Sequence, residues 1–93
     1  IGARLRYWDN SLLEFDETVV VEYDIILNKI SYRYHYQRGD GTMIVRYDNA
    51  PHHPELPGFP YHVHRPDRVE PADPPDLSEV LREINGHLYG ERK

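Results

Sequence analysis

The prolines of this chain divide it into two unlike parts. Residues 3–49 contain no proline, and all eight prolines lie between residues 50 and 75. A proline cannot donate a main-chain hydrogen bond to a neighbouring strand, so it rarely occurs in the middle of a sheet. Residues 3–49 are instead rich in β-branched and aromatic side chains, which favour strands. The sequence therefore predicts a sheet over residues 3–49 and a long loop over residues 50–75, with room for one short strand.

Apolar and polar side chains alternate along much of the first part. Such alternation indicates strands with one buried and one exposed face. The strands expected from it cover residues 4–8, 12–15, 19–27, 30–37 and 43–48. The apolar face of the last two includes Tyr32, Tyr34, Tyr36 and Tyr47. These rings could stack on unpaired bases, but core packing is the better interpretation because they share a face with aliphatic residues.

Asp40-Gly41 is the strongest short hairpin signal in the chain. A two-residue turn there places His35 opposite Arg46 and Arg33 opposite Asp48. A register slip of two residues would bring the like charges of Arg33 and Arg46 together, and a slip of one residue would exchange the buried and exposed faces. We therefore expect the unslipped register.

A second turn at Asn28-Lys29 would pair the two preceding strands in the same way. Polar side chains would then form two rows across the sheet, Glu22-His35-Arg46 and Asp24-Arg33-Asp48. The charged members of these rows could form solvated ion pairs, which contribute only about 0–1 kcal/mol each. From the strand pattern alone, such a ladder of ion pairs is the simpler interpretation.

Residues 76–89 are predicted to form an amphipathic helix. Asp76 begins it as an N-cap, and Glu79 completes a capping box. Apolar residues follow at helical spacing, at positions 77, 80, 81, 84 and 88. The fold class is therefore α+β: a mainly antiparallel sheet of about four to five strands, packed by one C-terminal helix in a single domain of residues 1–93.

Composition and charge limit the classes of function. The chain contains no cysteine, which excludes disulfides, thiolate zinc sites and cysteine nucleophiles. No segment approaches the roughly 18 apolar residues that a membrane helix needs, and residues 1–10 show no targeting signal. We therefore expect a cytoplasmic protein without a membrane partner. The net charge of −5 means that any contact with nucleic acid must be local.

Four of the six histidines lie between residues 52 and 64. In an extended segment His62 and His64 project to the same side, where they could bind one divalent metal such as zinc or act on one substrate. In a strand the adjacent His52 and His53 would point to opposite sides, so at most one of them would face a site. Histidines two residues apart also occur in many strands that bind no ligand.

Histidines can act on RNA without a metal, because their charge changes near neutral pH. One histidine would take the proton from a ribose 2′-hydroxyl, and another would protonate the leaving oxygen. Arg46 suits the stabilisation of the charge that develops on the phosphorane. His35 lies beside Arg46 in the expected register, with Glu22 able to orient it. Asp48 and Asn49 lead directly into the histidine-containing loop.

This loop and its flanks resemble the TumE family of prokaryotic toxin–antitoxin proteins. The similar segments are RYDNAPHHPE at residues 46–55, FPYHVH at 59–64, YRYHY at 32–36 with GDG at 39–41, and LSEVL at 77–81. The resemblance implies a small cytoplasmic toxin that acts on RNA and is encoded beside a helix-turn-helix antitoxin.

By position, the resemblance assigns a site to Arg46, Asp48, Asn49, His52, His53, His62 and His64, with His35 beside it. Tyr61 stands where the family often has a further histidine. This departure argues against a histidine-rich metal cage and places more weight on His62 and His64.

Three functions fit these residues. The first is a type II toxin that cleaves RNA by histidine general acid–base catalysis without a cofactor, with Arg46 as the electrostatic stabiliser. The second is a metal-dependent hydrolase or nuclease that uses His62 and His64 with Asp48 or another histidine. The third is a non-enzymatic module whose loop binds a partner protein. In each case the chain could also form a homodimer.

Overall fold

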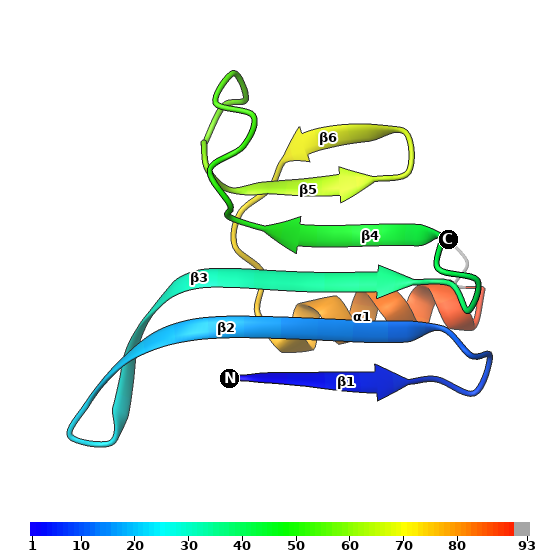
Figure 1. Cartoon of the computed structure of the whole chain (residues 1–93), viewed down its shortest axis with the longest axis horizontal. Helices are drawn as coiled ribbons and strands as arrows, with labels where there is room; N and C mark the ends of the chain where they lie inside the picture. The colour runs from blue at the N-terminus through cyan, green and yellow to red at the C-terminus, as the bar shows by residue number, and fades with distance from the viewer. Residues whose placement is uncertain (91–93) are drawn as a thin grey trace.

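A computed structural model describes residues 1–90 as one antiparallel sheet with a single helix (Figure 1). The sheet has six strands, and each of the first five pairs with the strand that follows it along the chain. The elements are β1 (Gly2–Arg6), β2 (Leu12–Glu22), β3 (Ile25–Gln37), β4 (Met43–Asp48), β5 (His62–Arg65), β6 (Arg68–Pro71) and α1 (Leu77–Leu88). The predicted α+β class with a C-terminal helix is confirmed. The described part of the chain contains no helix with the length and apolar character needed to cross a membrane.

The strand count is higher than expected because the proline-rich segment forms a hairpin of its own. Residues 50–75 contain both β5 and β6, where the sequence predicted room for one strand. Pro66 lies in the turn between them, and Pro71 ends β6 at the edge of the sheet. A proline at an edge or in a turn removes no hydrogen bond from the middle of a sheet. The prolines therefore mark the limits of these strands without preventing them.

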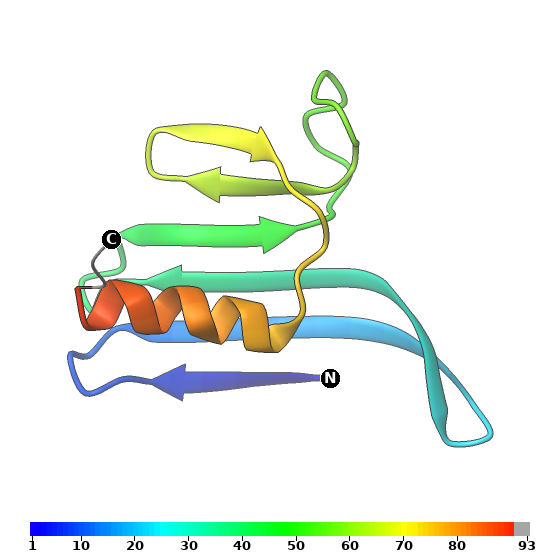
Figure 2. The same cartoon turned by 180° about the vertical axis from the view of Figure 1, so that it is seen from behind.

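Helix α1 covers one face of the sheet, as Figure 2 shows. Its buried residues Val80 and Ile84 belong to the same core cluster as Tyr34, Tyr36 and Val45. Tyr32, Tyr34 and Tyr36 are only 4%, 1% and 1% exposed, so the interpretation of these tyrosines as core is confirmed. Because strand side chains alternate, the residues between them lie on the face away from α1.

The helix begins as the sequence predicts. Asp76 is the N-cap, and its side chain accepts a hydrogen bond of 2.8 Å from the backbone N–H of Glu79. The Glu79 carboxylate accepts one of 2.9 Å from the backbone N–H of Asp76. This reciprocal capping box fixes the end of α1 that follows the loop.

The packing of α1 on the sheet yields a first prediction. Replacing Ile84, which is 1% exposed, by valine should destabilise the fold by about 1 kcal/mol, because it removes one buried carbon and leaves a small void. The thermal midpoint, followed by circular dichroism, should fall by about 4–8 °C in a domain of this size. Arg82→Lys, on the exposed side of the same helix, should change it little; an unchanged midpoint for Ile84→Val would contradict this packing.

The register of the β3–β4 hairpin is confirmed. His35 lies opposite Arg46 and Arg33 opposite Asp48, and an irregularity follows Tyr36. Gly41 in the connecting turn has a φ of 93°, a conformation that favours glycine.

The expected turn at Asn28-Lys29 is wrong. The β2–β3 hairpin turns at Tyr23-Asp24, where both residues have positive φ values of 53° and 63°. Two positive φ values are typical of the mirror-image turns whose twist matches that of a hairpin. This turn lets β2 pair with β3 along its whole length of 11 residues, because Leu12 to Glu22 form one strand instead of parts of two.

The corrected register changes the acidic members of the two polar rows. Glu14 instead of Glu22 lies opposite His35, and Asp16 instead of Asp24 lies opposite Arg33. Up to the Thr18–Ser31 pair the shift is eight residues, which is an even number, so the side chains of this part keep their faces; two irregularities interrupt the pairing beyond it. Alternation alone therefore could not distinguish the two registers.

Candidate functional site

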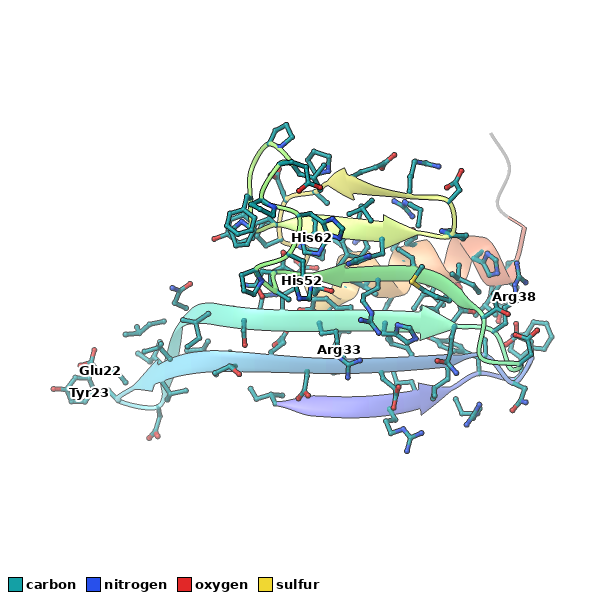
Figure 3. All side chains as sticks on the ribbon, turned by 45° about the horizontal axis from the view of Figure 1, so that its top comes forward. Glu22, Tyr23, Arg33, Arg38, His52 and His62 are labelled. Carbon is teal, nitrogen blue, oxygen red and sulfur yellow. The ribbon has the colours of Figure 1, made fainter. Side chains whose placement is uncertain are left out.

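Two rows of polar residues cross the sheet on the face away from α1. Pairing of β2 to β5 aligns Glu14, His35, Arg46 and His64 in one row, and Asp16, Arg33, Asp48 and His62 in the other. Strand β5 supplies the two histidines, since Arg46 pairs with His64 and Asp48 with His62. Figure 3 labels His62 on β5, His52 in the loop that follows β4, and Arg33 on β3.

A cleft of about 390 Å³ opens over these rows. It is lined by Asp16, Thr18, Ser31, Tyr32, Arg33, Arg46, Asp48, Asn49, Ala50, His52 and His64. The structure therefore brings five of the site residues assigned from the sequence to one cavity. The sequence missed Asp16, Thr18 and Ser31 because they reach the cleft only through the observed β2–β3 register.

Asp48, His62 and His64 form a compact cluster at the base of this site. The Nε2 atom of His62 lies 2.9 Å from Oδ1 of Asp48 and 3.0 Å from Nε2 of His64. The Nε2 atom of His64 lies 3.6 Å from Oδ2 of Asp48. Asp48 and His62 are 5% and 1% exposed, so water competes little for these groups.

In the neutral form of His62, two hydrogen-bond acceptors would face each other in the cluster. Its Nδ1 lies 2.7 Å from the carbonyl oxygen of Pro60, to which it must donate. In a neutral ring the Nε2 atom is then an acceptor, yet it faces a carboxylate oxygen of Asp48. A proton or a metal cation between these atoms removes the conflict. The three side chains offer ligand atoms within 4.8 Å of one another, a spacing that could hold one metal ion.

His64 connects the cluster to the cleft. Burial lowers the pKa of His64 below its usual value, although the Asp48 carboxylate opposes this shift. The ring is therefore mainly neutral at pH 7 and can accept a proton. Its side chain retains 21% exposure and lines the cavity, so a substrate could reach it.

Of the adjacent residues His52 and His53, His52 lines the cleft, whereas His53 lies beside the rings of His62 and His64. His53 has a φ of 59°, so this part of the loop is not a strand and its side chains do not alternate. The ring centroid of His53 lies 5.7 Å from that of His62 and 5.8 Å from that of His64. His52 is exposed and lines the cleft.

Arg46 is held by a histidine instead of a carboxylate. Its Nε donates to Nδ1 of His35 over 3.1 Å, and Nε2 of His35 lies 3.0 Å from the side-chain oxygen of Gln37. Both ring nitrogens of His35 are thus engaged, and burial lowers its pKa, which keeps the ring neutral. His35 therefore suits an orienting role and not proton exchange with a substrate.

The expected ladder of ion pairs is not formed. Within residues 1–90, neither Arg33 nor Arg46 makes an ion pair with a carboxylate. Both arginines line the cleft, so their charge is available to an anionic ligand.

Asn49 connects the end of β4 to β3. Its side-chain oxygen accepts from the backbone N–H of Tyr32 over 3.0 Å, and its Nδ2 donates to the carbonyl of Ile30 over 3.1 Å. Asp48 accepts a further hydrogen bond of 3.1 Å from the backbone of Ala50. These contacts position the start of the loop that carries His52 and His53.

Comparison with known proteins identifies one family. The model of the family described as Toxin TumE matches residues 1–88. No significant match was found among curated proteins or among solved structures. The family match covers both polar rows, the loop and all of α1, so the chain belongs to the TumE family and is a toxin of a toxin–antitoxin system, with an antitoxin as its partner.

Proposed function

We propose that this toxin belongs to a type II pair and cleaves RNA in the cleft by histidine general acid–base catalysis. The observation that carries the proposal is that Arg46, His52 and His64 line one cavity on the polar face of the sheet. A base, an acid and a cation are the three groups that cleavage of an RNA phosphodiester requires.

In the proposed mechanism, neutral His64 takes the proton from a ribose 2′-hydroxyl. The resulting oxygen attacks the adjacent phosphorus, and protonated His52 gives its proton to the leaving 5′-oxygen. The guanidinium of Arg46 stabilises the additional negative charge on the phosphorane. The products are a 2′,3′-cyclic phosphate and a free 5′-hydroxyl. Asp48 and His62 hold the ring of His64 in place through the contacts described above.

The charge distribution supports local binding of RNA. The chain has a net charge of −5, but two arginines, Arg33 and Arg46, line the cleft. Within residues 1–90 neither of them forms an ion pair with a carboxylate. A phosphate group there can pair with a guanidinium, although the carboxylates of Asp16 and Asp48 also line the cleft. We place this activity in the cytoplasm, with a helix-turn-helix antitoxin as the partner.

A second candidate is a metal-dependent hydrolase or nuclease, and the cluster of Asp48, His62 and His64 favours it. Ligands of a tetrahedral zinc ion at about 2.0–2.1 Å lie about 3.3 Å from one another. The observed separations of 2.9, 3.0 and 3.6 Å surround this value. In addition, His62 donates its other ring N–H to a backbone carbonyl, as metal-binding histidines commonly do. A metal held there would supply activation of a water molecule.

An RNA cleavage assay in excess EDTA separates the two candidates. Under the proposed function, untagged protein should cleave at full rate in EDTA and leave 2′,3′-cyclic phosphate ends. His64→Ala protein, purified identically, controls for contaminating nuclease. Cleavage that stops in EDTA and returns with zinc would contradict the proposal and support the metal-dependent candidate. Absence of cleavage under both conditions would contradict both and favour a non-enzymatic binding module.

A further inference from the structure

The β2–β3 hairpin extends well beyond the rest of the sheet (Figure 1). Strand β1 pairs with β2 only as far as Asp16, and β4 pairs with β3 only from Arg33 onward. Residues 18–31, here called the arm, therefore form a two-stranded ribbon in which neither outer edge pairs with another strand of residues 1–90.

Most of the large apolar side chains of the arm are exposed to solvent. The exposed fractions lie between 42% and 90% for Val20, Val21, Tyr23, Ile25, Ile26, Leu27 and Ile30. Neighbours such as Ile25 and Ile26 point to opposite sides of the ribbon, so both of its faces are apolar. A two-stranded hairpin without a packed face is marginally stable in water. An exposed apolar surface of this kind marks an interaction site.

The charges of the arm indicate what covers it. Glu22 and Asp24 are exposed at its tip, where Figure 3 shows Glu22 beside Tyr23. The cation of the arm, Lys29, points back to the body of the protein. Its Nζ lies 3.4 Å from the Glu17 carboxylate and 2.9 Å from the carbonyl oxygen of Pro75. A basic partner would complement the arm, whereas a second copy would bring the same exposed acids and a lysine that is already engaged.

We propose that the arm is the docking site of the antitoxin, and that the antitoxin contacts it with a segment that combines apolar and basic side chains. The exposed acids disfavour RNA and anionic lipid as occupants. The position of the arm also explains how a bound antitoxin would inhibit the toxin, because Thr18 and Ser31 at the base of the arm line the cleft. An antitoxin bound along the arm lies next to the cleft and can extend over it.

Binding of the purified cognate antitoxin, measured by isothermal titration calorimetry, tests the proposal. The variant Val21→Ser/Ile26→Ser removes two apolar side chains that pair across the arm, and Glu22→Lys/Asp24→Lys reverses the charge of the tip. Each variant should weaken antitoxin binding by at least about tenfold. Trp8→Ser is the matched control, since Trp8 is 72% exposed at the opposite end of the sheet and should leave binding unchanged.

Three further measurements make the result decisive. Circular dichroism must show the same fold for wild type and variants, and RNA cleavage without antitoxin should be unchanged, because the altered residues do not line the cleft. Wild-type affinity in both folded arm variants would overturn the proposal, as would a failure of the native toxin to bind the antitoxin.

Light scattering tests a second copy of the chain as the occupant of the arm. A dimeric wild type and a monomeric arm variant that still binds the antitoxin would assign the arm to the second copy. If the native protein binds the antitoxin as expected but does not cleave RNA, only the proposed function is contradicted.

Discussion

Replacement of His64 by alanine is expected to lower the rate of RNA cleavage by about 10²–10⁴-fold, the usual contribution of a positioned general base. His64 lines the cleft and is mainly neutral at pH 7, because burial lowers its pKa. Single-turnover cleavage of an RNA oligonucleotide measures the loss. His87→Ala removes an exposed histidine of α1, away from the cleft, and should retain the wild-type rate.

The neighbouring His62 separates the two candidate mechanisms in the same assay. Under acid–base catalysis His62 only holds Asp48 and His64 in place, so His62→Gln, whose amide can donate a hydrogen bond to Asp48, should lose much less activity than His64→Ala. Under the metal-dependent mechanism both substitutions remove a ligand, and the losses should be similar. Wild-type cleavage by a folded His64→Ala protein would contradict a role for this residue in either mechanism.

Local signals made the β3–β4 hairpin and α1 predictable. Asp40-Gly41 favours one turn geometry, and a slip of two residues would oppose like charges while a slip of one would expose the apolar face. The capping residues Asp76 and Glu79 likewise lie within one turn of the element that they begin. In both cases residues close in sequence determine the structure.

The β2–β3 pairing could not be predicted by the same means. Acidic residues at positions 14 and 16 and at positions 22 and 24 alternate in phase, so two registers fit the pattern equally well. Asn28-Lys29 resembles a turn more closely than Tyr23-Asp24, where a tyrosine adopts a positive φ. The longer ladder of paired strands, a property of the whole hairpin, outweighs this local preference.

The histidine pair became part of a site only through a contact between distant segments. His62 and His64 were expected on one side of an extended segment, and they are. Their alignment with Asp48 and Arg46 depends on the pairing of β5 with β4, across a proline-rich segment that suggested a loop. The sequence therefore indicated which residues belong together, while the tertiary pairing determines how they face one another.

Arg46→Ala is expected to lower the cleavage rate by about 10²–10³-fold, the loss typical of removing one donor to a developing negative charge. Arg46→Lys should recover only part of this, because an ammonium group lacks the planar array of donors that guanidinium offers to phosphate. Within residues 1–90 Arg46 makes no ion pair with a carboxylate, so the alanine variant should keep the wild-type thermal midpoint within a few degrees. A folded Arg46→Ala protein with wild-type activity would remove Arg46 from the mechanism.

The role of His35 in orienting Arg46 follows from the same reasoning and has a matched pair of variants. His35→Asn keeps an acceptor near the position of Nδ1, which takes the hydrogen bond from Nε of Arg46, whereas His35→Leu removes it. The leucine variant should therefore resemble Arg46→Lys in rate, and the asparagine variant should stay closer to wild type. Combining His35→Leu with Arg46→Ala should add little to the loss from Arg46→Ala alone, because His35 acts through Arg46. Additive losses in the double variant would instead mean that His35 contributes to cleavage by a separate route.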